Sequence, residues 1–151
     1  MKLIDSILTD AASIAAIRKD IHAHPELCFQ EVRTADVVAQ QLTDWGIPIH
    51  RGMGTTGVVG IVHGRDGGAS GRAIGLRADM DALPMDEQSD LPYRSQRPGV
   101  AHTCGHDGHT SALLGTARHL VAHPPATGRR GGAGPGPHGP PFHDLARTQG
   151  A

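Results

Sequence analysis

The residues best suited to chemistry lie in one eight-residue segment, 102–109. It contains one cysteine, one aspartate and three histidines, with two glycines that allow close approach. Thiolate, imidazole and carboxylate ligands suit zinc, manganese, cobalt or nickel better than magnesium or calcium. We therefore predict that Cys104 and His106 bind a divalent metal, with Asp107 or His109 supporting the ligands by hydrogen bonds. The alternative is a polar loop that ends in a helix N-cap at Asp107 or the following glycine.

A pair of carboxylates upstream is a second candidate for the same site. An apolar run containing Ile74 and Leu76 leads into Asp79 and Asp81. On an extended backbone, residues two positions apart point to the same side, and ligands of α/β proteins bind at the carboxyl ends of strands. Neighbouring carboxylates repel each other, and a cation relieves that repulsion. The pattern is thus compatible with a cation site, and the alternative is that the two aspartates only cap a loop.

Two other motifs have a simpler structural interpretation. The segment His22-Ala23-His24-Pro25-Glu26 contains metal-ligand residue types, but its spacing alone favours the surface end of a helix. Residues 52–57, Gly-Met-Gly-Thr-Thr-Gly, match the GxGxxG fingerprint of dinucleotide-binding sites. That fingerprint must open a helix, whereas β-branched residues follow it here. We therefore predict a glycine turn between strands.

Hydrophobic periodicity predicts three helices. Apolar residues recur at helical spacing over Ile4–Ile21 and over Glu31–Trp45. The first helix should end near Pro25, because the residue before a proline avoids helical backbone. The third helix should begin just after Gly108 and extend to about Val121. Its buried face should consist of Leu113, Leu114, Ala117, Leu120 and Val121.

Two strands are predicted between the second and third helices. They are Val58–Val62 and Arg72–Asp79, and the glycine-rich residues 64–71 between them predict a hairpin. The order helix, helix, strands, helix indicates an α/β domain with a central sheet. Because two or three strands make only a small sheet, we expect much of its surface to remain uncovered.

Charge and composition exclude several classes of protein. The 151-residue chain has 14 basic and 15 acidic residues, which argues against a strongly basic nucleic-acid binder. No apolar run approaches the roughly 18 residues of a membrane helix, and charged residues interrupt the N-terminus where a secretory signal would be apolar. Two cysteines provide no disulfide framework. We therefore expect a cytoplasmic protein that binds neither nucleic acid nor membrane.

The chain changes character after residue 123. Residues 124–141 contain six prolines and six glycines, and residues 124–151 contain only Phe142 and Leu145 as large aliphatic or phenyl side chains. Such a composition cannot bury enough apolar surface to offset the entropy of ordering. We therefore predict a core-forming region over 1–123 and a disordered tail over 124–151.

Taken together, these segments resemble the M20 metallopeptidase family. The matching pieces are His22-Ala23-His24-Pro25-Glu26, Gly54-Thr55-Thr56-Gly57-Val58, Arg77-Ala78-Asp79-Met80-Asp81-Ala82-Leu83-Pro84 and His102-Thr103-Cys104-Gly105-His106-Asp107-Gly108-His109-Thr110. Their order and spacing also fit, and the resemblance covers roughly residues 5–126. The most similar branch is the amidohydrolases that cleave N-acyl amino acids such as hippurate.

The resemblance implies a fold, a reaction and a set of roles. Residues 1–123 would be the N-terminal part of a zinc-peptidase-like catalytic domain, with helices around a mixed sheet. The reaction would be amide hydrolysis by a metal-activated water at a site for two divalent metals. Cys104 and His106 would be ligands and Asp81 would orient a ligand. Asp79 stands where many relatives have a histidine ligand.

The chain also departs from the family pattern. Longer relatives continue after the third helix into a strand and a Pro-Ala-Glu-Glu motif, which supplies the general base, and they carry a dimerisation domain that implies homo-oligomers. Here no glutamate follows Glu87. We expect a truncated chain that is frame-shifted after about Gly128 and is inactive. The alternative function is a small non-catalytic protein that binds a metal or a partner through the Cys104–His109 loop.

Overall fold

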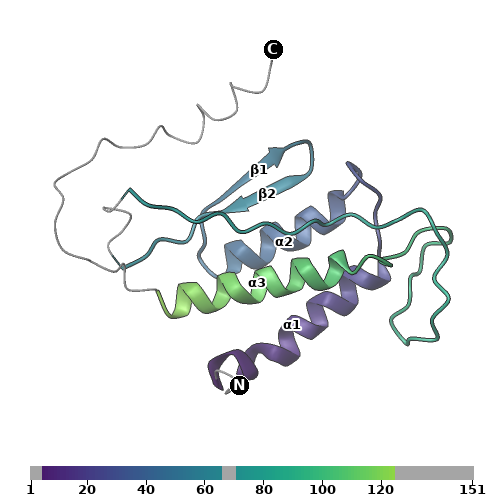
Figure 1. Ribbon diagram of the computed structural model, residues 1–151, viewed down its shortest axis with the longest axis horizontal. Helices are drawn as coiled ribbons and strands as arrows, with labels where there is room; N and C mark the ends of the chain where they lie inside the picture. The colour runs from purple at the N-terminus through teal and green to yellow at the C-terminus, as the bar shows by residue number, and fades with distance from the viewer. Residues whose placement is uncertain (1–4, 66–70, 125–151) are drawn as a thin grey trace, which may run out of the picture.

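The computed structural model describes residues 5–65 and 71–124. Its elements along the chain are α1 (Asp5–Ala23), α2 (Val32–Asp44), β1 (Ile49–Met53), β2 (Gly57–Gly60) and α3 (His106–Ala122). In Figure 1, α3 crosses the middle of the molecule, with α1 on one side and α2 with the β1–β2 hairpin on the other. The architecture is α/β, as the order of the predicted elements indicates.

Helices α1 and α2 confirm the first two helices predicted from hydrophobic periodicity, and each end lies within two residues of the predicted one.

The turn between α1 and α2 is organised by Glu26. Its carboxylate accepts hydrogen bonds from the backbone N–H groups of Arg33 and Thr34 at 3.1 and 2.8 Å, and from the Thr34 hydroxyl at 2.9 Å. The first N–H groups of a helix lack intrahelical partners. Glu26 therefore caps α2 from outside the helix.

The hairpin lies at a different place from the one predicted. Strand β2 confirms a strand at the start of Val58–Val62, but its partner is β1, which the sequence analysis missed. The predicted glycine turn at 52–57 is confirmed, with Gly52 and Gly54 at φ +86° and +57°. Four of the five residues of β1 are exposed. It therefore lacks the apolar alternation by which a strand is recognised in a sequence.

Residues 72–79 are extended but form no strand in this structure. Residues 73–78 make no backbone–backbone hydrogen bond with any other described residue. The predicted hairpin joining this segment to Val58–Val62 is therefore wrong for the described residues, and residues 66–70 of its expected turn lie outside them. A sequence reports the tendency of a segment to be extended, whereas a strand also needs a hydrogen-bonded partner.

Helix α3 begins at His106, earlier than the predicted start just after Gly108. The N-cap residue is Gly105, which has a left-handed backbone at φ +83°. Its carbonyl oxygen accepts the N–H groups of Gly108 and His109 at 3.0 and 3.1 Å. A glycine adopts this conformation without steric cost. The helix therefore starts directly after Gly105.

The hydrophobic core lies between α2, α3 and the hairpin. Its buried members are Val38, Leu42, Ile47 and Leu114. Of the five residues predicted for the buried face of α3, only Leu114 is fully buried, and the others are partly exposed. The predicted disordered tail lies outside the described residues, apart from Pro124. Among the described helices, none has the length and apolarity to cross a membrane.

Candidate metal site and the charged network behind it

The start of α3 separates two neighbouring residues. His106 and Asp107 are the first two residues of the helix after Gly105. Successive residues of an α-helix point about 100° apart around its axis. The imidazole of His106 accordingly contacts Asp81, whereas the carboxylate of Asp107 contacts α1. The histidine and the aspartate of this motif therefore take part in different clusters.

Asp81 holds the ring of His106 through two oxygens. The Nδ1 atom of His106 lies 2.8 Å from the Asp81 backbone oxygen and 2.9 Å from its Oδ1. Both oxygens are acceptors, so Nδ1 is the atom that carries the proton. The lone pair of the neutral ring is then on Nε2, which has no hydrogen-bond partner among the described residues. This is the arrangement in which a carboxylate prepares a histidine to bind a metal.

Cys104, two residues before His106 in the sequence, is the second ligand that the sequence predicts. It is exposed and is not in a disulfide. Within residues 5–65 and 71–124, no three His, Cys, Asp or Glu side chains gather into a group that could hold a metal ion. A closed zinc site needs four ligands and a catalytic one needs three protein ligands. The described residues thus offer part of a ligand set and do not complete one.

Asp79 and His109 lie near this site without joining it. The Asp79 carboxylate forms an ion pair with Arg77, and its backbone oxygen accepts the Thr110 hydroxyl at 2.9 Å. The ring of His109 is 5.7 Å from the ring of His106, centroid to centroid. The two aspartates that the sequence places on one side therefore make different contacts, and only Asp81 contacts His106.

Asp107 is the centre of a buried charged network. Its side chain is fully buried, and its Oδ2 accepts hydrogen bonds from Arg18 Nε at 3.0 Å and His22 Nδ1 at 2.9 Å. The other ring nitrogen of His22 donates to Glu87 Oε1 at 3.0 Å. Because both nitrogens face carboxylates, His22 is an imidazolium. The network joins α1, the start of α3 and the loop that contains Glu87.

The surface interpretation of the His22–Glu26 motif is therefore wrong. His22 is only 8% exposed, and Glu26 caps α2. His24, which is partly exposed, hydrogen-bonds the backbone oxygen of Asp20. Metal-ligand residue types in this motif serve a structural purpose. Arg18 lies 89 positions from its partner Asp107, and Glu87 lies 65 positions from its partner His22, so no local spacing could have identified these pairs.

The network changes the pKa values of its members. Burial lowers the pKa of His22, but the hydrogen bonds to Glu87 and Asp107 outweigh it and raise the value above 6.5. Burial raises the pKa of Asp107, yet the hydrogen bonds from His22 and Arg18 bring it below the ordinary value. Glu87 is also partly desolvated, but hydrogen bonds from Ser89, the Ser95 backbone and His22 lower its pKa to about 2. Hydrogen bonds to each carboxylate thus favour its ionised form over the effect of burial.

His102 is a buried histidine to which the sequence analysis gave no role. It is 5% exposed, and neither ring nitrogen has a hydrogen-bond partner among the described residues. Its ring lies 6.2 Å from that of His22, centroid to centroid. Desolvation lowers its pKa, so the ring stays neutral. In the sequence, the burial of His102 is indicated only by the two apolar residues directly before it, Val100 and Ala101, which are also buried.

Known proteins resemble this chain over most of its length. Residues 75–132 match the model of peptidase family M20/M25/M40. The chain is 48% identical over 122 residues to hippurate hydrolase of Campylobacter jejuni, covering 81% of this chain and 31% of that protein. This chain belongs to the M20 peptidase family. It is also 43% identical over 118 residues to the N-acyl-L-amino acid amidohydrolase of Geobacillus stearothermophilus, covering 78% and 30% of the two chains.

Solved structures share the fold of this M20 chain. The YxeP protein of Bacillus subtilis, described as a dinuclear metal binding peptidase of the family, matches with a TM-score of 0.71 at 39% identity. The match covers 78% of this chain and 32% of YxeP. The M20 chain therefore spans about a third of the length of the relatives it matches. The three relatives named here are hydrolases by their descriptions.

Proposed function

We propose that this M20 chain carries part of the active site of a metal-dependent amidohydrolase that cleaves the amide bond of N-acyl amino acids such as N-benzoyl-glycine. The observation that carries the proposal is the His106 ring, which Asp81 holds through Nδ1 so that Nε2 is available, two residues after the free and exposed Cys104. The identity to hippurate hydrolase supports this substrate class.

The residues have separate roles in this proposal. Cys104 and His106 supply two donors to divalent metal, and Asp81 holds the His106 ring and its tautomer. The network of Asp107, His22 and Glu87 fixes the start of α3, from which His106 projects. Such donors suit zinc, manganese, cobalt or nickel, and in this reaction class the metal polarises the amide carbonyl and activates water. The remaining ligands would come from outside the described residues.

We further propose that the 151-residue polypeptide alone does not hydrolyse these substrates. It has three glutamates, and each is engaged elsewhere. Glu26 caps α2, Glu31 accepts the Thr56 hydroxyl at 2.7 Å, and Glu87 bonds His22. A general base contributes about 10²–10⁴-fold to such a reaction. The chain therefore has no uncommitted glutamate for that role.

A chimaera tests the function directly. Residues 1–124 of this chain would replace the corresponding region of Campylobacter jejuni hippurate hydrolase, and hydrolysis of a panel of N-acyl amino acids would be measured with added manganese, cobalt or zinc. We expect turnover that His106→Ala abolishes and that Cys28→Ala, at the other exposed free cysteine, leaves unchanged. A folded, metal-loaded chimaera without turnover on any member of the panel would contradict the proposal.

The second candidate is a small metal-binding or partner-binding protein without catalysis. The free exposed thiols Cys28 and Cys104 fit a reducing compartment, and we propose the cytoplasm for either function. Tight metal binding by the 151-residue chain would favour this candidate. Weak binding that depends on Cys104 and His106 would favour the amidohydrolase.

A further inference from the structure

We propose that His119 and His123, at the end of α3, form a second metal site that holds one nickel, copper or zinc ion through two imidazoles. The pair lies at the opposite end of the helix from Cys104 and His106, so the two sites share no ligand. This inference goes beyond the proposed hydrolysis, because it concerns another ion and involves no substrate.

The two rings are already close enough to bind one ion. His119 is in the last turn of α3 and His123 is its C-cap residue, and side chains at i and i+4 are neighbours on a helix surface. Their ring centroids lie 4.6 Å apart, with 22° between the ring planes. With metal–nitrogen distances of about 2.1 Å, two imidazoles at right angles on one ion have centroids about 4.5 Å apart. Binding therefore needs only a turn of the rings about χ2, which is a soft torsion.

One nitrogen of each ring is available to a metal. The Nδ1 atom of His123 lies 3.3 Å from the backbone oxygen of His119, so Nδ1 carries the proton. The Nδ1 atom of His119 lies 3.4 Å from the hydroxyl oxygen of Ser6 on α1. Neither Nε2 atom has a hydrogen-bond partner within residues 5–65 and 71–124. A ring held through Nδ1 with Nε2 unoccupied is the usual arrangement of a metal-binding histidine.

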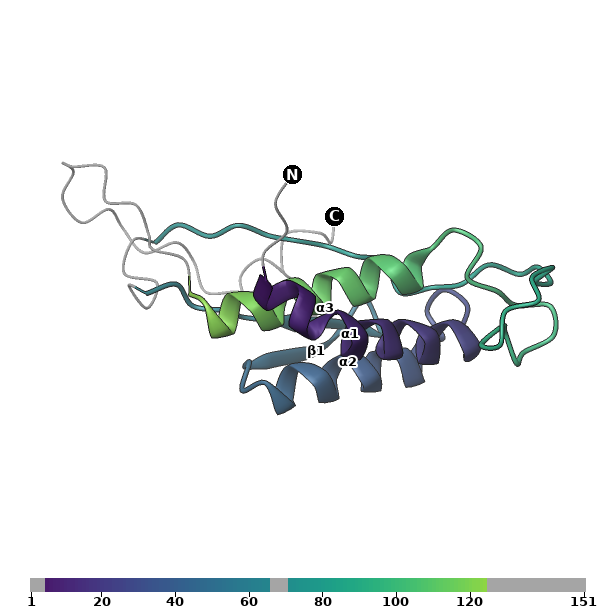
Figure 2. The ribbon, with the colours of Figure 1, turned by 90° about the horizontal axis from the view of Figure 1, so that it is seen from below.

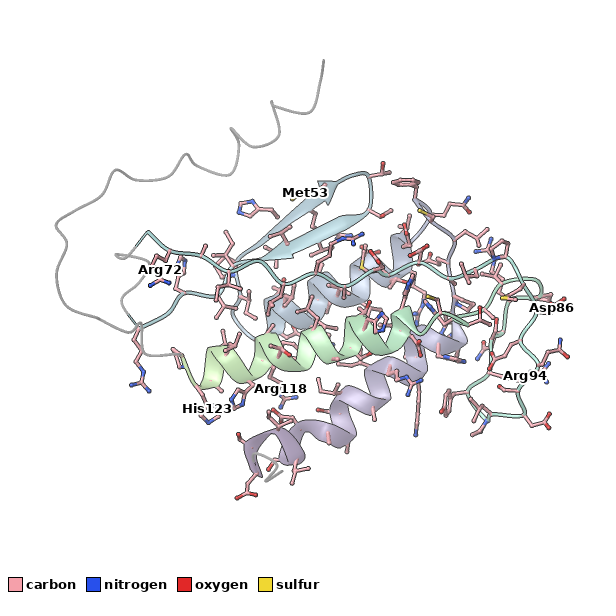
Figure 3. All side chains as sticks on the ribbon, in the orientation of Figure 1. Met53, Arg72, Asp86, Arg94, Arg118 and His123 are labelled. Carbon is pink, nitrogen blue, oxygen red and sulfur yellow. The ribbon has the colours of Figure 1, made fainter. Side chains whose placement is uncertain are left out.

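The electrostatic surroundings favour a cation at this end of α3. The C-terminus of a helix carries a partial negative charge, which stabilises cations in its last turn. Arg118 lies at the same end of the helix as His123 (Figure 3). Its guanidinium pairs with Asp10 at 2.9 Å and lies over the ring of Trp45 at 5.5 Å. The positive charge of Arg118 is therefore balanced by an anion, and the exposed His123 can be reached from solvent.

The donor set determines the class of metal and the strength of binding. Imidazole nitrogens suit nickel, copper and zinc, and copper binds such donors most tightly of the three. Within the described part of the chain, no third histidine, cysteine or carboxylate joins the pair. A closed structural zinc site needs four protein ligands. The pair therefore forms an open site, in which water completes the coordination and the ion exchanges with solution.

A bound ion would hold the last turn of α3 in its helical form. Figures 1 and 2 both show the end of α3 beside the start of α1, and the contact between Ser6 and His119 joins the two helices there. The ends of helices open more readily than their middles. An ion that binds only the folded turn stabilises it by mass action. We therefore expect metal to protect the backbone amides of residues 119–123.

The experiment measures both the affinity for metal and the place where it binds. The 151-residue chain would carry Cys28→Ala and Cys104→Ala, at its two exposed thiols, so that neither thiol competes for the ion. Isothermal titration calorimetry with nickel chloride gives the affinity, and amide hydrogen exchange with and without nickel gives the place. We expect saturable binding with a dissociation constant below about 0.1 mM, and slower exchange in residues 119–123.

A double-mutant cycle tests whether the two histidines hold the same ion. His119→Gln or His123→Gln leaves one imidazole at the site, and we expect each change to weaken nickel binding at least tenfold. The variant with both changes should bind little more weakly than either single variant, because the effects of two ligands on one ion do not add. His50→Gln, at an exposed histidine on β1, is the matched control and should bind nickel like the parent chain.

Three results would overturn the inference. They are exchange in residues 119–123 that nickel leaves unchanged, single variants that bind as tightly as the parent chain, and losses that add fully in the double variant. The last result would show that each histidine binds an ion of its own. The test is separate from that of the proposed function, because a chimaera without turnover leaves the metal site at His119 and His123 standing, and failure of this site leaves the proposed hydrolysis standing.

Discussion

His106 Nδ1 lies 2.8 Å from the backbone oxygen and 2.9 Å from the side-chain Oδ1 of one residue, Asp81. The backbone contact survives any substitution at position 81, but the carboxylate contact does not. The backbone oxygen can therefore keep the tautomer, while the carboxylate of Asp81 fixes the orientation of the ring and strengthens it as a metal ligand.

Removing the carboxylate should weaken metal binding without unfolding the chain. We expect Asp81→Ala to lower the affinity of the 151-residue chain for zinc, manganese or cobalt by about 10–100-fold, the usual effect of losing a carboxylate behind a histidine ligand. Isothermal titration calorimetry measures it. The control is Asp90→Ala, an exposed carboxylate on the neighbouring loop. Equal affinities for Asp81→Ala and the control would contradict the role given to Asp81.

The buried carboxylate of Asp107 should be the most sensitive position for stability. Asp107→Asn leaves the His22 imidazolium and Arg18 without their anion, and breaking a buried pair costs about 3–5 kcal/mol. Urea unfolding followed by circular dichroism would report the loss. Asp79→Asn, whose carboxylate pairs with an exposed arginine, should change the free energy of unfolding by less than about 1 kcal/mol. A loss at Asp107 no larger than that at Asp79 would disprove the network.

The contribution of His22 to stability should decrease as the pH rises. Its folded pKa is raised above the unfolded value of 6.5, so its stabilisation is fully present below about pH 6.5 and is lost as the pH rises through the folded pKa. The pKa of Glu87 is about 2 in the folded chain and 4.5 in the unfolded chain. Glu87 therefore stabilises the fold above about pH 4.5, and this stabilisation is lost as the pH falls towards 2. The His22–Glu87 pair should therefore contribute most to the free energy of unfolding between about pH 4.5 and 6.5.

A variant isolates that contribution. His22→Gln keeps hydrogen-bonding capacity and removes the charge, and we expect it to cost about 1–3 kcal/mol near pH 6. The cost should shrink as the pH rises through the folded pKa of the parent histidine, which lies above 6.5. Unfolding curves at matched pH give the difference, and His50→Gln, on the exposed strand β1, serves as control. A cost that grew with pH would show that His22 is neutral in the folded chain.

Glu26 should stabilise the protein by capping the N-terminus of α2. We expect Glu26→Ala to lower the free energy of unfolding by about 0.5–2 kcal/mol, because the N–H groups of Arg33 and Thr34 lose their acceptor. Glu26→Gln should retain only part of the stability, since its single amide oxygen can replace only one of the two carboxylate oxygens that accept these bonds. Chemical denaturation measures both. A Glu26→Ala variant as stable as the parent chain would contradict the capping role of Glu26.

The local elements of this protein follow from the sequence. Helical periodicity located α1 and α2 to within two residues, and the glycines at 52–57 predicted the turn of the hairpin, because both depend on neighbouring residues. The segment 102–109 identified Cys104 and His106 as candidate ligands from residue type alone. The motif match also indicated the M20 family before any geometry was known.

Tertiary structure decided what each polar residue contacts. His106 and Asp107 are adjacent in sequence, yet the left-handed Gly105 and the helical turn direct one to Asp81 and the other to Arg18 and His22. His22 lies 65 positions from Glu87 and 85 from Asp107, so no local pattern marks it as buried. Residues 72–79 have a strand-like sequence, but a strand requires a partner, and pairing is a property of the whole fold.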